Sequence, residues 1–102
     1  MGQHFFRFKQ FTVYQERAAL KVSTDSCIFG AWVAQKAQQL APANVLDIGA
    51  GSGLLMLMLA QKLQVPIDGV ELDPISAEQA RENIAATPWA QRLQVATADI
   101  QE

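Results

Sequence analysis

Residues 45–54 read VLDIGAGSGL, a short apolar run that leads into a turn with three alternating glycines and then into a second apolar run. Glycine lets the backbone approach a ligand closely, and a helix that begins beyond such a turn offers free N–H groups. Further along, residues 70–73 read VELD, so the next predicted strand ends in a carboxylate. A carboxylate at the tip of the second strand holds a ribose diol in nucleotide-binding folds. The pattern predicts a site for an adenosine-containing cofactor.

The spacing of the glycines separates two classes of cofactor. The dinucleotide fingerprint is G-x-G-x-x-G, whereas Gly53 comes one residue early and Leu54 stands where that fingerprint has glycine. Asp47 precedes the glycines, and a carboxylate there repels a phosphate and attracts an ammonium group. The pattern D-x-G-x-G-x-G therefore favours S-adenosylmethionine, which has a cationic amino-acid end and no phosphate. A nicotinamide-dependent oxidoreductase is the less favoured alternative, and the sequence has no G-x-x-x-x-G-K-[ST] phosphate loop.

Length and composition indicate one small globular domain, since the chain has 102 residues of which 50% are hydrophobic and 18% charged. No apolar run approaches the roughly 20 residues that span a bilayer. The single cysteine, Cys27, excludes an internal disulfide and fits a reducing compartment. With one histidine and one cysteine, a zinc site of ordinary ligand count is not available. We expect a cytoplasmic protein that binds neither a metal nor a membrane.

The charge is unevenly distributed along the chain. Residues 1–21 contain four basic and one acidic residue, a balance of +3, whereas the other residues contain four basic and nine acidic residues, a balance of -5. The basic segment is rich in aromatic residues, a composition that can meet nucleic acid by phosphate attraction and base stacking. The alternative is a half-buried strand in which Phe6 and Phe8 alternate with Arg7 and Lys9.

Alternating strands and helices are expected along the chain. Residues 5–22 read as two extended pieces with a polar interruption at 15–17. A helix capped by Asp25 or Ser26 runs to about Leu40, with Ile28, Phe29, Trp32 and Val33 as its apolar face. The further elements are strands at 44–48, 67–72 and 93–96, a helix at 54–63, and a helix that begins at Pro74 behind an Asp73 cap and runs to about Ala86. Trp32 and Trp89 are expected in the core.

These elements predict an α/β fold, the first half of a doubly wound, Rossmann-like parallel sheet with three parallel strands, flanking helices and an N-terminal extended segment. Strand 44–48 should lie beside strand 67–72 with its other edge open, a template for self-association. We expect residues 1–102 to be the N-terminal, cofactor-binding part of a single domain, with strands four onward absent.

Short motifs lie on both sides of the glycine turn: FKQFTV at 8–13, KVSTD at 21–25, GAW at 30–32, VELDP at 70–74, AREN at 80–83 and PW at 88–89. Together with LDIGAGSG at 46–53 they resemble the bacterial tRNA(Val) adenine-N6 methyltransferases, which modify the adenine next to the anticodon. The glycine motif alone indicates only class I methyltransferases that use S-adenosylmethionine. KVSTD and GAW narrow the resemblance, which covers essentially the whole chain.

The resemblance implies roles for particular residues. Asp47 and the backbone of Gly49, Gly51 and Gly53 would face the methionine part of the cofactor, Glu71 would accept from both ribose hydroxyls, and Leu72 would pack on the adenine. Asp99 would accept from the adenine amino group with the backbone of Ile100 nearby, and Lys21, Thr24 and Asp25 would line the carboxylate end.

The family also carries an Asn-Pro-Pro-[Tyr/Phe] motif that holds the target amine, and this sequence has none. The resemblance therefore implies a tRNA-binding methyltransferase whose catalytic group is missing here, and we expect no activity from this chain alone. A non-catalytic cofactor-binding fragment is the alternative.

Overall fold

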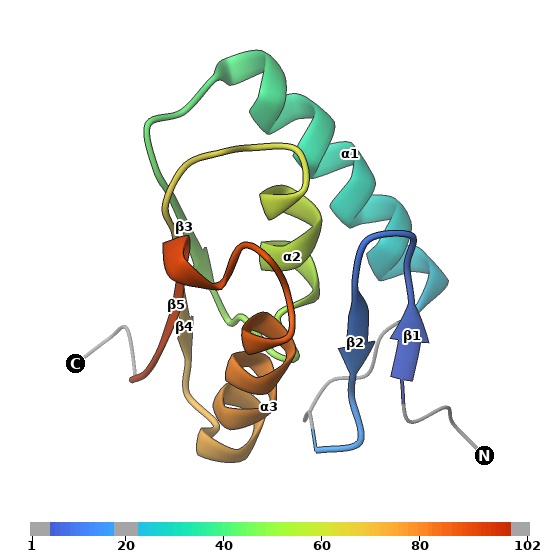
Figure 1. Ribbon diagram of the computed structural model, residues 1–102, viewed down its shortest axis with the longest axis vertical. Helices are drawn as coiled ribbons and strands as arrows, with labels where there is room; N and C mark the ends of the chain where they lie inside the picture. The colour runs from blue at the N-terminus through green and yellow to red at the C-terminus, as the bar shows by residue number, and fades with distance from the viewer. Residues whose placement is uncertain (1–4, 18–22, 99–102) are drawn as a thin grey trace.

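The computed structural model describes residues 5–17 and 23–98, and Figure 1 shows how their elements are arranged. In chain order the elements are β1 (Phe5–Arg7), β2 (Thr12–Tyr14), α1 (Thr24–Leu40), β3 (Val45–Ile48), α2 (Leu54–Ala60), β4 (Ile67–Glu71), α3 (Pro74–Ala85), the 3₁₀ turn η1 (Ala90–Arg92) and β5 (Leu93–Thr97). None of the helices in these two ranges is both long and apolar enough to cross a membrane.

Three parallel strands form the main sheet, in the order β3-β4-β5. Val45 pairs with Ile67, and Ile67 in turn pairs with Leu93, so the strands are in step at their first residues. Helices connect the strands because parallel neighbours need a crossover between them. The α/β fold class, the parallel sheet and the place of β3 beside β4 are all confirmed.

Helices cover one face of this sheet. Figure 1 shows α2 and α3 on the same side of the strands, where Ile67 and Leu93 are buried beneath them. α2 is buried nearly all round, as its run of Leu and Met predicts, and α1 packs against it. On the other face, Leu46 and Ile48 of β3 are 55% and 59% exposed. The fold is thus one helical layer on one parallel sheet.

The N-terminal extended pieces form an antiparallel hairpin, with Phe5 opposite Tyr14 and Arg7 opposite Thr12. The turn of this hairpin lies at 8–11 and is closed by a 2.7 Å bond from the amide N of Phe8 to the carbonyl O of Phe11, so both strands fall within the first predicted extended piece. A turn at 16–17 agrees with the predicted interruption at 15–17, and residues 18–22 after it lie outside the described residues. The rings of Phe8 and Phe11 stack at 4.7 Å, and Phe11 meets Trp89 edge-on. These rings attach the turn to the core, where Trp89 was expected.

Helix α1 differs from its prediction at both its start and its face. Ser23, and not Asp25 or Ser26, is the N-cap, in a capping box that Ser26 completes from the third helical position. Three residues expected on the inner face are outside instead, with Ile28, Phe29 and Trp32 at 64%, 58% and 57% exposed. The side facing the core carries smaller residues, Cys27, Val33, Ala34 and Ala37. Helix α2 packs so closely there that even a Cβ on Gly30 would clash with the side chain of Met58.

The remaining boundaries differ by one residue or a few. α2 ends at Ala60 and not at 63, since residues 61–62 turn away from the helix although the amide N of Leu63 still bonds the carbonyl O of Leu59 at 2.8 Å. Asp73 caps α3 as predicted, by accepting from the amide N of Ser76 at 3.1 Å.

Candidate cofactor site

The glycine turn between β3 and α2 has a backbone that only glycine adopts readily. Gly49, Gly51 and Gly53 have φ angles of +80°, +57° and +88°, a region disfavoured for residues with a Cβ. A Cβ built on Gly49 or Gly51 would meet nothing within 4 Å. The backbone of the turn is therefore open on the side where those side chains would stand, and a ligand can approach it there.

Glu71 joins this turn to the start of α3. It ends β4, and its carboxylate oxygen Oε1 accepts from the amide N of Gly51 at 2.7 Å while Oε2 accepts from the amide N of Asp73 at 3.0 Å. Each carboxylate oxygen accepts more than one hydrogen bond, so Glu71 retains capacity for two further donors. Glu71 ends the strand as predicted, and its bond to Gly51 is a feature that the motif did not reveal. Its contact with a ribose stays a prediction.

Asp47 brings a second carboxylate to the same place. It lies on β3 in register with Gly69 of β4 and is mostly buried. Burial, with a further contribution from the negative charge of Glu71, raises the pKa of Asp47 to about 6. Two neighbouring carboxylates make a place where a cation is favoured and a phosphate is not.

The other predicted residues fall into two groups. Leu72 follows Glu71 at the strand tip and is 66% exposed, so its side chain is available to a flat ligand. Thr24 is the first residue of α1, and its contact with a cofactor stays a prediction. Lys21, Asp99 and Ile100 lie outside the described residues. The structure thus brings together Asp47, Gly49, Gly51, Gly53, Glu71 and Leu72.

Asn83, quoted above within the AREN motif without a role, is a structural part of the site. Its side chain, 1% exposed, accepts from the amide N of Tyr14 at 2.9 Å and donates to the carbonyl O atoms of Tyr14 and Ser52, both at 2.8 Å. Ser52 belongs to the glycine turn and Tyr14 to β2, so one amide ties the hairpin to the turn. The sequence signal for a buried, bonded role was that Asn83 lies on the same buried face of α3 as Ser76 and Ala80.

The sequence profile of the methyltransferase domain family matches residues 45–102. The chain belongs to this family. It is 60% identical over 99 residues to a tRNA1(Val) (adenine(37)-N6)-methyltransferase of Cronobacter sakazakii, across 94% of this chain and 38% of that protein. It is 49% identical over 102 residues to the protein of the same description from Cytophaga hutchinsonii, across 100% of this chain and 42% of that one. The resemblance seen in the motifs is confirmed, and the chain spans about two fifths of the length of these relatives.

Solved structures agree with the architecture. The O-methyltransferase from Bacillus cereus, solved in complex with SAH, superposes with a TM-score of 0.70 at 25% identity, across 83% of this chain and 38% of that chain. The match confirms the Rossmann-like methyltransferase fold that the alternation of strands and helices predicted.

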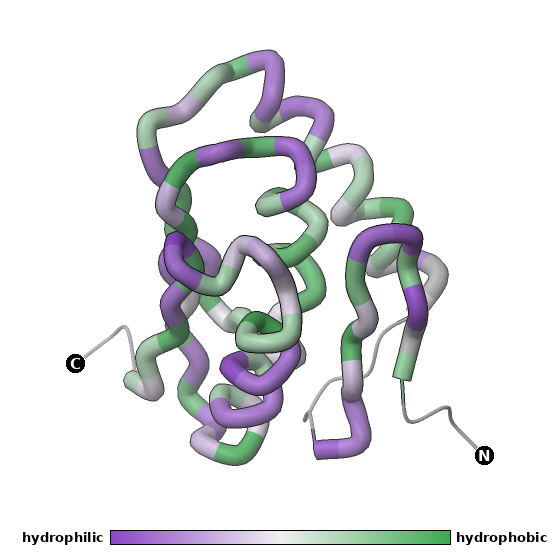
Figure 2. Tube along the Cα trace, in the orientation of Figure 1, coloured by the Kyte–Doolittle hydropathy of each residue, from purple (hydrophilic) through white to green (hydrophobic). Residues whose placement is uncertain are grey.

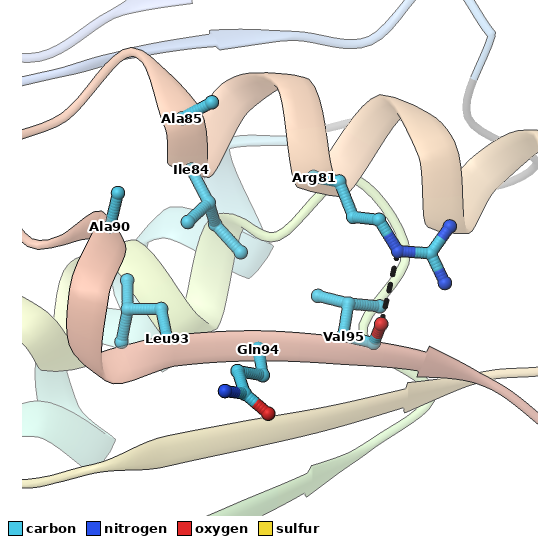
Figure 3. A pocket seen from close by; sticks show the side chains of 7 residues that line it. All are labelled: Arg81, Ile84, Ala85, Ala90, Leu93, Gln94 and Val95. Carbon is cyan, nitrogen blue, oxygen red and sulfur yellow. Dashed lines mark hydrogen bonds between the residues drawn. The ribbon is translucent and has the colours of Figure 1, made fainter.

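A cavity of about 380 Å³ in this methyltransferase domain lies away from the glycine turn, between α3 and β5. Figure 3 shows Arg81 reaching from α3 to β5, where its Nε donates to the carbonyl O of Val95 at 3.0 Å. Its Nη2 also donates to Oγ1 of Thr97 at 2.8 Å. The guanidinium thereby satisfies acceptors along the outer edge of β5, and none of the predicted site residues lines this cavity.

Proposed function

We propose that this chain forms the cofactor-binding part of a cytoplasmic methyltransferase that uses S-adenosylmethionine to modify the N6 amine of an adenine in tRNA(Val), next to the anticodon. The observation that carries the proposal is the carboxylate of Glu71 bonded to the amide N of Gly51 at 2.7 Å. This bond supports the proposal because a carboxylate, the group that suits a ribose diol, lies directly beside a turn with an open backbone. The tRNA substrate rests on the names of the curated relatives.

The chemistry of the site fits this cofactor. The two hydroxyls of a ribose would donate to the two oxygens of Glu71 in charge-assisted bonds, which are stronger than neutral ones. The cationic methionine end would lie near Asp47, whose ionised form it would favour. The space where side chains would stand on Gly49 and Gly51 is empty of other atoms of the described residues, so the chain of the cofactor can run along the turn.

When bound, S-adenosylmethionine would supply a methyl group carried on a sulfonium sulfur, and the methyl carbon is the atom that the exocyclic amine of adenine would attack. This chain's own residues contribute position and charge: the turn and Glu71 hold the nucleoside, and Asp47 holds the ammonium end. Such a reaction depends chiefly on orientation and on the exclusion of water. The sequence contains no Asn-Pro-Pro-aromatic motif to grip the amine, so we assign cofactor binding, and not transfer, to these 102 residues.

Calorimetric titration with S-adenosylhomocysteine tests the proposal. Glu71→Ala should weaken binding by about 1.5–3 kcal/mol, the range for hydrogen bonds to a charged group. Glu71→Gln keeps one acceptor oxygen for Gly51 but loses the charge, so it should weaken binding less than Glu71→Ala does. Glu78→Ala is the matched control because Glu78 is exposed on α3 and should leave affinity unchanged.

Circular dichroism should show that all three variants are folded. An unchanged affinity in folded Glu71→Ala would remove Glu71 from the cofactor site. Loss of binding in the Glu78 control would point to a general defect and would equally contradict the assignment.

A further inference from the structure

We propose that the β1–β2 hairpin is an RNA-docking surface, on which Arg7 and Lys9 hold a backbone phosphate and the Phe5–Tyr14 pair stacks on an unpaired base. The choice of RNA as the ligand rests on the proposed function. The hairpin residues that would bind the RNA are new to this inference.

One face of the hairpin carries the aromatic pair and Arg7, and Lys9 lies in the turn between the strands. Side chains alternate between the two faces of a strand, and Phe5 and Arg7 are two residues apart on β1, as are Thr12 and Tyr14 on β2. Because Phe5 pairs with Tyr14 and Arg7 pairs with Thr12, these four residues share a face. On the opposite face Val13 is fully buried against the core. The hairpin thus buries one face and presents an aromatic pair beside a cation on the other.

A cavity of about 410 Å³ lies beside the cationic end of this face, lined among others by Arg7, Lys9, Thr12, Tyr14 and Thr87. Arg7 and Lys9 are exposed, and no ion pair joins either of them to another of the described residues. Arg17 differs from them, since it pairs with Glu82. Two cations without a carboxylate, next to the hydroxyl of Thr12, suit the oxygens of a phosphate. Figure 2 shows the turn of the hairpin as a hydrophilic end.

The aromatic end of the same face favours a nucleic acid over a simple anion. The rings of Phe5 and Tyr14 lie 5.8 Å apart and tilted, and the two residues are 40% and 48% exposed. Bases of a single strand stack on exposed aromatic side chains, and cations beside them follow the backbone. Along β1, Arg7 is about 7 Å from Phe5 at the usual rise per residue, so one nucleotide can contact both.

The hairpin is also connected to the cofactor site. Asn83 bonds both backbone groups of Tyr14 and the carbonyl O of Ser52 in the glycine turn. The residue that carries the stacking ring is therefore joined to the turn through a single side chain. The positive balance of residues 1–21, against the negative balance of the rest of the chain, draws a polyanion toward this end of the molecule.

The test measures binding of a fluorescent, unmodified tRNA(Val) transcript at several salt concentrations. Arg7→Gln with Lys9→Gln should weaken binding at least tenfold and lower the slope of log K against log salt by about 0.7, the value for one phosphate contact to a single strand. Lys36→Gln with Lys62→Gln removes the same charge elsewhere and should leave the slope unchanged. Tyr14→Leu should weaken binding about tenfold without altering the slope, since stacking is not ionic.

Affinity for S-adenosylhomocysteine should stay unchanged in all these variants, which separates this inference from the assignment of the cofactor. Equal tRNA affinity in the Arg7/Lys9 variant and the lysine control would overturn the docking surface while leaving the cofactor site intact. Poly-glutamate that displaces the tRNA from wild-type protein but not from the Arg7/Lys9 variant would identify an acidic peptide as the partner and overturn it as well.

Discussion

Replacing Asn83 by alanine breaks a side-chain link between the hairpin and the glycine turn. Alanine removes three hydrogen bonds of 2.8–2.9 Å from a side chain that is 1% exposed. A buried polar group that loses its partner costs about 1–3 kcal/mol. The bond to the carbonyl O of Ser52 is buried, so that group bears the cost in full. The two bonds to the backbone of Tyr14 are only partly buried, so water replaces part of their loss. We expect a destabilisation of about 3 kcal/mol, a large fraction of the 5–15 kcal/mol typical of small domains.

Urea denaturation followed by circular dichroism measures this directly. The midpoint should fall while the slope with urea stays constant, because the mutation changes stability and not the surface exposed on unfolding. Asn44→Ala is the matched control, since Asn44 is exposed just before β3, and it should stay within about 0.5 kcal/mol of wild type. A difference below about 1 kcal/mol between the two variants would refute the reasoning, because even one orphaned buried carbonyl costs that much.

Three further predictions concern pH, activity and assembly. Because the pKa of Asp47 is raised to about 6 and a cationic ligand favours its ionised form, affinity for S-adenosylhomocysteine should rise roughly tenfold from pH 5 to pH 7; Asp47→Asn should flatten the profile, and an unchanged profile in that variant would show that another group titrates. The 102 residues should transfer no radiolabelled methyl group to unmodified tRNA(Val), because no motif in them grips the target amine; incorporation well above a no-protein blank contradicts this. Self-association should occur through β3, whose outer edge pairs with no described strand and whose Leu46 and Ile48 are 55% and 59% exposed; light scattering should show a second copy bound and Ile48→Lys should weaken it, whereas a monomer at all concentrations would rule it out.

Local sequence signals were enough for the sheet, for the glycine turn and for the positions of the two carboxylates beside it. The three strands follow from short apolar runs between glycine and proline punctuation, and the turn follows from glycines that the structure places at positive φ. Glu71 and Asp47 were identified because a carboxylate at a strand end, or beside a glycine turn, has few other uses. These signals depend on neighbours in the chain, and the structure confirms where they place the residues.

Packing between distant segments could not be deduced in the same way. The outer face of α1 carries Trp32 and Phe29 while its inner face packs closely on α2, an arrangement invisible in the helix itself. The bonds of Asn83 span 69 and 31 positions in the chain, to Tyr14 and Ser52. The bond from the amide of Gly51 to Glu71 spans 20. Nothing in the local pattern of an amphipathic helix or a strand end specifies such partners.

Calorimetric titration of the unmodified chain with S-adenosylhomocysteine and with NAD tests the assignment of the cofactor most directly. The early third glycine, the carboxylate of Asp47 and the bonded position of Glu71 predict tighter binding of S-adenosylhomocysteine, because its cationic end suits the carboxylates and a diphosphate does not. Tighter binding of NAD would contradict the assignment.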